Sequence, residues 1–156
     1  MSERSIEHAT FAVERTYDAS PARVFAAWAD SAAKGRWFGD AGEESSEYEL
    51  DFRVGGRELS RGAGPDGEMY TYEAHFQDIV PDQRIVYTYE MQRDETRISV
   101  SLGTVELEEE GGGTRLIYTE HGAFLDGLDK PEYREQGTGT IFDALGAELQ
   151  RQAAKA

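Results

Sequence analysis

The sequence predicts an α+β fold in which a curved antiparallel sheet of six to seven strands wraps around one long C-terminal helix. Three observations support this prediction. An alternating strand at residues 7–17 is followed by two short helical segments that end near Phe38. A long run of segments with a two-residue period then extends from about residue 45 to 123. The chain closes with an amphipathic helix at about residues 138–153.

The N-terminal segment combines a strand with two helices. Apolar and polar residues alternate over 7–17, which indicates a half-buried strand. Ser20 is a favourable N-cap and Pro21 suits the first helical position, so a helix is predicted over 21–29. A second helix is expected to run to about Phe38.

The middle of the sequence has the period of an antiparallel meander. A strand is predicted over 48–54, and Gly55-Gly56 fits a two-residue hairpin turn, because such turns need positive φ. The next strands are expected at 57–62, 68–80 and 84–92.

The following strand contains a change of phase. The apolar residues at 98–102 share one parity, whereas Val105 and Leu107 share the other. One extra residue at Gly103-Thr104 would reconcile the two, so we expect a β-bulge there that bends the sheet.

A last strand at 114–123 and a polar loop at 125–136 precede the final helix, which is predicted over 138–153. The segment 137–140 would open that helix and could offer amides to an anion.

A cavity is expected between the sheet and the final helix. Strands of ten or more residues are long, and their apolar face must be covered. One helix, about 10 Å wide, cannot fill the concave side of such a sheet. Tyrosines are frequent at the inward positions, and each buried hydroxyl needs a partner, which favours a partly wet pocket. The predicted cavity residues are Trp37, Phe38, Tyr72, Phe76, Tyr87, Tyr89, Met91, Tyr118, Phe124 and Phe142.

Composition excludes several classes of protein. The 156 residues suggest one domain, spanning 1–156, and the absence of cysteine rules out disulfides and thiolate chemistry. A formal net charge of −15 argues against nucleic acid and anionic membrane surfaces as partners. The sequence shows no apolar leader and no stretch long enough to span a membrane, so we expect a cytoplasmic protein.

A family resemblance covers almost the whole chain. It is carried by FAVERTYDASPARVFAAWAD, GRWFG, RVGGRE, GPDGEMYTYEAHFQDIVPDQRIVYTYE and GTVELEEEGGGTRLIYTEHGAF. With these segments the chain resembles the helix-grip SRPBCC superfamily, which includes START lipid-transfer domains, polyketide cyclases and the birch-pollen allergen. Within it, the chain is similar to homologues of the activator of the heat shock protein 90 ATPase. The resemblance implies a β-α-α-β6-α order with a cavity under the last helix, and no shared catalytic signature.

Glu120 is the main candidate for chemistry. If it shares the inward face of its strand with Leu116 and Tyr118, a carboxylate lies in an apolar cavity, where burial should raise its pKa as a general acid or base requires. The alternative is a solvated Glu120, or one paired with an arginine. His121 has the opposite parity and is expected to face outward. No metal site and no cofactor are predicted, because the three histidines have no metal-ligand spacing.

Three functions remain open at this point. The leading hypothesis is a protein that binds a small hydrophobic molecule such as a lipid, a steroid or a polyketide. The second is a cyclase-like or isomerase-like enzyme in which Glu120 and a tyrosine move protons. The third is a domain that binds a chaperone or regulator, as the family name suggests. Pairing as a homodimer is also plausible.

Overall fold

The computed structural model describes residues 4–38 and 47–155. Its strands form one antiparallel sheet in the order β1-β7-β6-β5-β4-β3-β2. The strands are β1 (Ile6–Tyr17), β2 (Glu47–Leu50), β3 (Arg57–Ala63), β4 (Met69–Val80), β5 (Arg84–Arg93), β6 (Thr96–Glu110) and β7 (Gly113–Leu125). The helices are α1 (Pro21–Ala29), α2 (Ser31–Trp37) and α3 (Pro131–Lys155).

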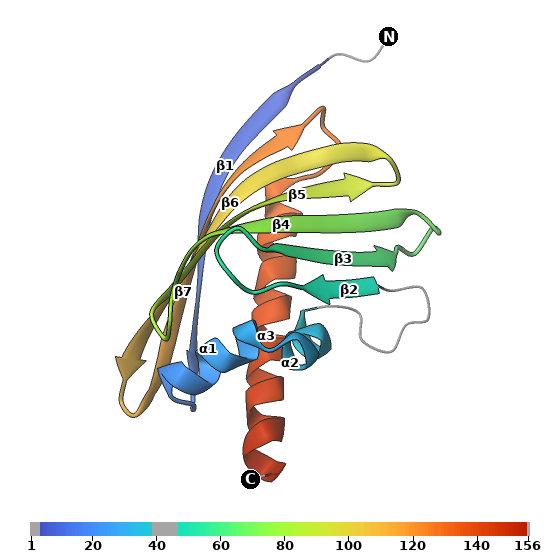
Figure 1. Ribbon diagram of the computed structural model, residues 1–156. Coiled ribbons are helices and arrows are strands. Elements are labelled where there is room, and N and C mark those ends of the chain that lie inside the picture. Colours follow the sequence, from blue (N-terminus) through green and yellow to red (C-terminus); the bar gives the residue numbers. More distant parts are fainter. Residues whose placement is uncertain (1–3, 39–46, 156) are drawn as a thin grey trace.

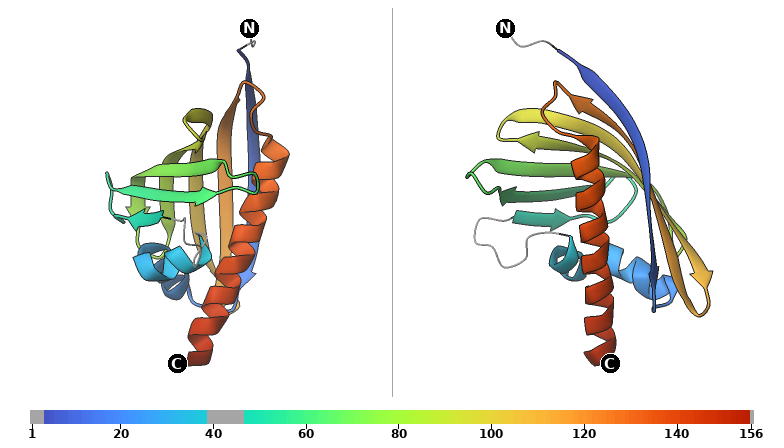
Figure 2. Two further views of the ribbon diagram at one scale, coloured as in Figure 1. Left: turned by 90° about the vertical axis from the view of Figure 1, so that its right-hand side faces the viewer. Right: turned by 180° about the vertical axis from the view of Figure 1, so that it is seen from behind.

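The sheet is strongly twisted, so that β1 runs upright in the view while β2 and β3 lie across it (Figure 1). The long helix α3 crosses its concave side, and the two short helices pack at one end of that side (Figure 2). This is the α+β architecture expected from the sequence, with two short helices after the first strand and a curved sheet around the last helix. No helix within the described ranges combines the length and apolar character needed to cross a membrane.

The start of α1 follows the sequence prediction closely. The Ser20 side chain accepts a hydrogen bond from the Arg23 amide, and Pro21 occupies the first turn. Trp28 on this helix is fully buried and packs edge-on against Trp37 of α2, with 4.9 Å between ring centroids. Trp28 also packs against Phe142 of α3, so that the three helices share one core.

The predicted β-bulge at Gly103-Thr104 is wrong. Gly103 pairs with Tyr87 on one side and Glu120 on the other, and the register continues without interruption through Thr104. A Cβ atom on Gly103 would lie 2.7 Å from the Tyr118 hydroxyl, so this glycine lets the tyrosine approach the backbone.

The change of phase in β6 has a different cause. Val100 and Leu102 lie on the outer face of the sheet, with 43% and 38% of their surface exposed, so they do not mark the core. The register shifts elsewhere, between Phe76 and Asp78 of β4 and directly after Met91 of β5. Apolar parity alone could not locate these shifts, because two apolar residues face solvent.

The strand after α2 is shorter than predicted, since β2 ends at Leu50. The turn before β3 is centred on Val54 and Gly55, because the Gly56 amide donates to the Arg53 carbonyl at 2.8 Å. Gly55 has φ of +84° and occupies the position of that turn that requires glycine. The predicted turn at Gly55-Gly56 is therefore displaced by one residue.

The final helix begins at Pro131, not near Thr138, and the loop predicted over 125–136 is correspondingly short. Its 25 residues span about 38 Å. Gly137 and Gly139 lie inside the helix, although glycine is unfavourable in a helix interior. Local helix propensity therefore predicted the wrong first residue for α3. The amides of this segment belong to the helix interior and do not form the open anion site considered from the sequence.

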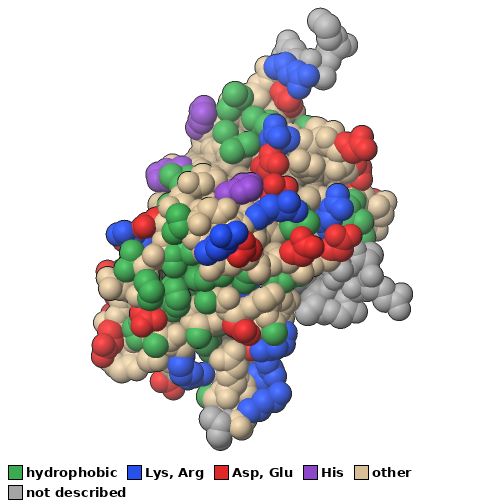
Figure 3. Space-filling model, in the orientation of Figure 1, with side chains coloured by type: hydrophobic (Ala, Val, Ile, Leu, Met, Phe, Trp, Pro, Cys, Tyr) green, Lys and Arg blue, Asp and Glu red, His purple; other side chains and the backbone are tan. Residues whose placement is uncertain are grey.

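The outer face of the sheet carries hydrophobic side chains among charges of both signs (Figure 3). His8, His121, Val100 and Leu102 line a shallow depression there. His121 faces outward as expected, with 3.0 Å between its Nδ1 atom and the Thr10 hydroxyl. Homodimerisation through this or another face stays a prediction.

Glu148 of α3 joins the long helix to α2. Its carboxylate accepts hydrogen bonds from Arg36 at 2.9 Å, from Arg151 at 3.0 Å and from Gln152 at 2.7 Å. The Arg36 hydrogen bonds, opposed by burial, lower the pKa of Glu148 to about 2. Because the pKa in the unfolded chain is higher, the ionised carboxylate stabilises the fold at neutral pH, and this contribution disappears as the pH falls from about 5 towards 2.

We therefore expect Glu148→Gln to lower the free energy of unfolding by about 1–3 kcal/mol at pH 7. The difference from wild type should shrink as the pH falls to about 3, because the unfolded wild-type chain then takes up a proton at Glu148 that the folded protein does not bind, which favours unfolding. Urea titrations at pH 7, 5 and 3 measure this, with Glu135→Gln on the exposed side of the same helix as the control. Parallel pH dependences for wild type and Glu148→Gln would contradict the assignment.

Candidate functional site

A cavity of about 340 Å³ lies between the concave side of the sheet and α3. Strands β3, β4, β5 and β7 form its floor, and the first three turns of α3 form its roof. The lining residues that are exposed to solvent, Ala63 of β3 and Tyr133 and Gly137 of α3, mark its mouth. A volume in this range is typical of small-molecule sites.

Most of the predicted cavity residues line this cavity in the structure. The aromatic floor and roof contain Phe38, Tyr72, Tyr87, Tyr89, Met91, Tyr118 and Phe142, together with Glu120. The rings are in mutual contact, with 4.8 Å between the centroids of Tyr72 and Tyr89 and a stacked pair of Tyr87 and Tyr118. Burial raises the pKa of these tyrosines above the usual value, so their hydroxyls stay protonated and can donate hydrogen bonds.

Three predicted residues do not line the cavity. Trp37 is buried behind it, and its indole donates to the Ala27 carbonyl at 2.9 Å. Phe76 packs against Phe52 in the core beneath α1. Phe124 lies under the Arg134 guanidinium, 5.2 Å from its ring centroid. All three are buried as expected for inward positions, but neighbouring side chains cover them and they do not border the open space.

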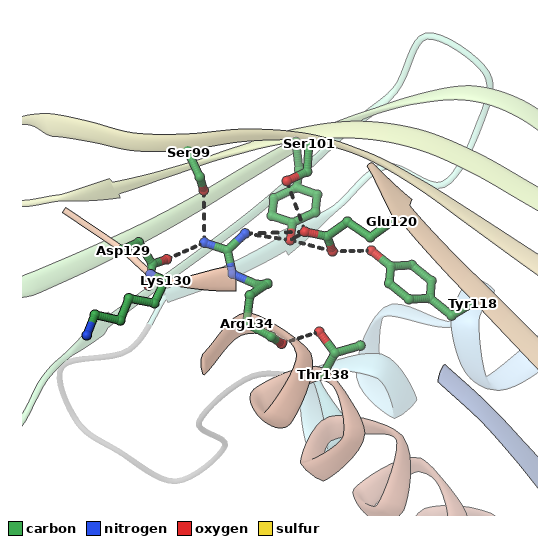
Figure 4. A network of polar contacts seen from close by, with 9 residues as sticks. Ser99, Ser101, Tyr118, Glu120, Asp129, Lys130, Arg134 and Thr138 are labelled. Atoms are coloured by element: carbon green, nitrogen blue, oxygen red, sulfur yellow. Dashed lines mark hydrogen bonds and ion pairs between the residues drawn. The ribbon is translucent and has the colours of Figure 1, made fainter. Parts of the chain in front are cut away.

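Glu120 points into the cavity wall and is 1% exposed (Figure 4). Its two oxygens accept hydrogen bonds from Tyr89 at 2.8 Å, Tyr118 at 2.7 Å and Ser101 at 3.0 Å. Arg134 lies at 3.5 Å and supplies the opposite charge. The inward orientation of Glu120 agrees with the sequence analysis, and so does the alternative that it is paired with an arginine. A buried carboxylate with this many donors is compensated for its loss of water.

Arg134 is a residue that the sequence analysis missed. It donates to Tyr89 and Ser99, at 2.8 Å in each case, and to Asp129 at 2.6 Å. Burial alone lowers the pKa of Arg134, but Tyr89, Glu120 and Asp129 outweigh it and raise the pKa above the usual value. Arg134 therefore stays charged and fixes the first turns of α3 to β5, β6 and β7. It was placed in a loop because the start of α3 was misassigned, so no helical spacing singled it out.

A second buried polar cluster lies next to the cavity and was also missed. The Lys34 ammonium of α2 is buried and donates to Glu58 of β3 at 2.8 Å, and Tyr48 of β2 donates to the same carboxylate. The ammonium lies 4.7 Å from the ring centroids of Trp28 and of Phe38. One sequence signal was available, since Lys34 precedes the buried Trp37 by three residues and so shares its helix face.

One hydroxyl in the cavity wall is unsatisfied. Tyr72 is buried, and its hydroxyl forms no hydrogen bond with any described residue. The only other buried side-chain atom in this state, among residues 4–38 and 47–155, is the Trp28 indole nitrogen, which lies in the core away from the cavity. Buried donors of this kind are rare in folded proteins, so the Tyr72 hydroxyl identifies a position where a partner is missing.

The described part of the chain contains no group of three or more histidine, cysteine or acidic side chains placed to hold a metal ion. The polar side chains of the cavity are hydroxyls, two carboxylates and one guanidinium. This set is suited to hydrogen bonding with an organic molecule.

A curved antiparallel sheet that encloses a tyrosine-walled cavity beneath one long helix defines a helix-grip domain. The family model described as Activator of Hsp90 ATPase homolog 1-like protein matches residues 18–150, and the chain belongs to this family.

Solved structures support the assignment. A protein from Rhizobium leguminosarum is 48% identical over 96% of this chain and 99% of its own, with a TM-score of 0.91. The Mll3558 protein from Rhizobium loti is 51% identical over 92% of this chain and 99% of its own, with a TM-score of 0.86. CV1439 from Chromobacterium violaceum shares the fold at 24% identity, covering 90% of this chain and 96% of its own, with a TM-score of 0.74. None of the curated proteins compared with the chain matches it.

Proposed function

We propose that this protein binds a small, mainly apolar organic molecule in the cavity between the sheet and α3. The observation that carries the proposal is a cavity of about 340 Å³ whose wall is largely aromatic. An apolar pocket with a few convergent polar groups is the usual form of a small-molecule site. Lipids, steroids and polyketide-like molecules are the classes that fit this description.

The helix that closes the cavity supports the proposal. Gly137 lines the mouth, and a Cβ atom built there would meet no atom within 4 Å. Glycine in a helix interior is destabilising by about 0.5–1 kcal/mol relative to alanine, and no packing contact requires it at this position. A residue that weakens the helix while leaving the mouth open is consistent with passage of a ligand.

Gly137→Leu tests this role, because it extends a side chain into the mouth. We expect the substitution to raise the free energy of unfolding by up to about 1 kcal/mol. At the same time, affinity for the neutral fluorescent probe N-phenyl-1-naphthylamine should fall by about 10-fold or more. Fluorescence titration and urea unfolding measure the two effects. Ala147→Leu adds the same side chain at an exposed position of α3 outside the cavity, and should bind the probe as wild type does.

Two outcomes would contradict the proposal. One is that wild-type protein does not enhance the probe's fluorescence. The other is that Gly137→Leu and Ala147→Leu bind it equally well. Native mass spectrometry of freshly purified protein adds an independent measurement, since a co-purified small molecule should appear as a mass increment that Gly137→Leu reduces.

An enzymatic role is the second candidate, and the position of Glu120 in the cavity wall favours it. A carboxylate beside Tyr89 and Tyr118 could exchange protons with a bound substrate. However, both carboxylate oxygens already accept hydrogen bonds, as expected of a carboxylate that holds the surrounding side chains in place. We therefore place binding ahead of catalysis. Interaction with a chaperone or regulator has no comparable support among the described contacts.

A further inference from the structure

The Tyr72 hydroxyl is the most specific feature of the cavity. Tyr72 lies on β4, and its ring is held by Phe38 on one side and Tyr89 on another, with centroid distances of 4.9 Å and 4.8 Å. The neighbouring hydroxyls of Tyr89 and Tyr118 both donate to Glu120, whereas that of Tyr72 has no described partner. Two fixed rings therefore hold a free O–H group at the cavity wall.

We propose that the ligand is a neutral molecule with a carbonyl-type oxygen, and that the Tyr72 hydroxyl donates a hydrogen bond to that oxygen. This inference rests on the proposed binding function and adds the chemical class of the ligand. A buried donor without an acceptor loses its hydration without replacement, so a ligand that supplies an acceptor gains affinity there.

The surroundings explain why the acceptor is neutral. Burial, with smaller contributions from Tyr87 and Glu58, raises the pKa of Tyr72 well above the usual value, so its proton stays on the oxygen. The positive groups nearby are already engaged, since Lys34 is paired with Glu58, and Arg134 with Glu120 and Asp129. A ketone, quinone or enone oxygen meets these conditions.

The ligand body is expected to be flat and aromatic or polyunsaturated next to that oxygen. The rings of Phe38 and Tyr89 pack against the Tyr72 ring that carries the hydroxyl, and aromatic rings pack on one another with an energy beyond simple area burial.

A matched pair of probes tests the hydrogen bond directly. 9-Fluorenone carries a carbonyl, and fluorene has the same three-ring skeleton without it. We expect wild-type protein to bind 9-fluorenone about 10-fold more tightly than fluorene, and Tyr72→Phe to bring this ratio close to one. Tyr17→Phe is the matched control, because Tyr17 does not line the cavity and its hydroxyl donates to the Phe142 carbonyl, so this variant should keep the wild-type ratio. The infrared carbonyl stretch of bound 9-fluorenone should lie at lower frequency in wild type than in Tyr72→Phe.

The outcomes separate this inference from the proposed function. Equal affinities for the two probes in wild type, or a carbonyl frequency that Tyr72→Phe leaves unchanged, would overturn the inference. If N-phenyl-1-naphthylamine binds in that case, the cavity still accepts ligands and only the class is wrong. If none of the three probes binds wild-type protein, the binding function itself fails. Circular dichroism melting of Tyr72→Phe verifies that the variant is folded, and the infrared measurement on wild type tests the hydrogen bond without it.

Discussion

Replacement of Glu58 by leucine is expected to lower the free energy of unfolding by about 3–5 kcal/mol, because it leaves the Lys34 ammonium buried without its counter-charge. Lys34 and Glu58 are both fully buried, and their side chains are 2.8 Å apart. Tyr48 would lose its acceptor at the same time. Urea unfolding measures the loss, with the m-values of the variant and the wild type compared.

The double variant Lys34→Met/Glu58→Leu is the control, because it removes both charges and retains apolar volume. We expect it to recover most of the lost stability, since well-packed apolar residues often replace a buried ion pair without penalty. If Glu58→Leu alone were within about 0.5 kcal/mol of wild type, the pair would not be buried as described.

The pH dependence of Glu58→Leu should have a defined sign. Burial lowers the pKa of Lys34, and the Glu58 charge and hydrogen bond oppose that shift, so their removal lowers the pKa further. The unfolded chain then binds more protons than the folded one as the pH rises towards 10.5, and the free energy of unfolding increases with pH in this window. The stability deficit of Glu58→Leu should therefore be smaller at pH 9 than at pH 7.

Arg134→Met is expected to lower the free energy of unfolding by about 3 kcal/mol and to release the first turns of α3. The change removes the cation next to Glu120 and all contacts from the guanidinium to Tyr89, Ser99 and Asp129. Glu120 keeps its three hydroxyl donors, so the expected loss of unfolding free energy lies at the lower end of the range for a broken buried ion pair.

Hydrogen exchange locates the effect. Amides of residues 134–140 should exchange faster in Arg134→Met than global unfolding explains, because the guanidinium attaches this part of the helix to the sheet. Arg134→Lys is the matched variant: it keeps the charge but not the planar set of donors, and should fall between wild type and Arg134→Met. Unchanged exchange in this segment would contradict the role assigned to Arg134.

Several structural features could be predicted from local sequence because their causes are local. The cap at Ser20 and the proline after it begin α1 through contacts between neighbouring residues. Two-residue alternation identified the long strands, since a half-buried sheet requires it. Apolar residues on the outer face misled the same analysis at Val100 and Leu102, because alternation records polarity and not the side on which the core lies.

The site itself depended on contacts between distant parts of the chain. Periodicity within single segments was enough to predict the order of the elements, the aromatic lining contributed by β4, β5 and β7, and the inward direction of Glu120. The pairing of Arg134 with Glu120 and of Lys34 with Glu58, and the absence of a partner for Tyr72 among the described residues, could be seen only once the chain was folded. Each of these depends on which strand and helix meet at that point, because the fold brings together residues that are 14 and 24 positions apart in the sequence.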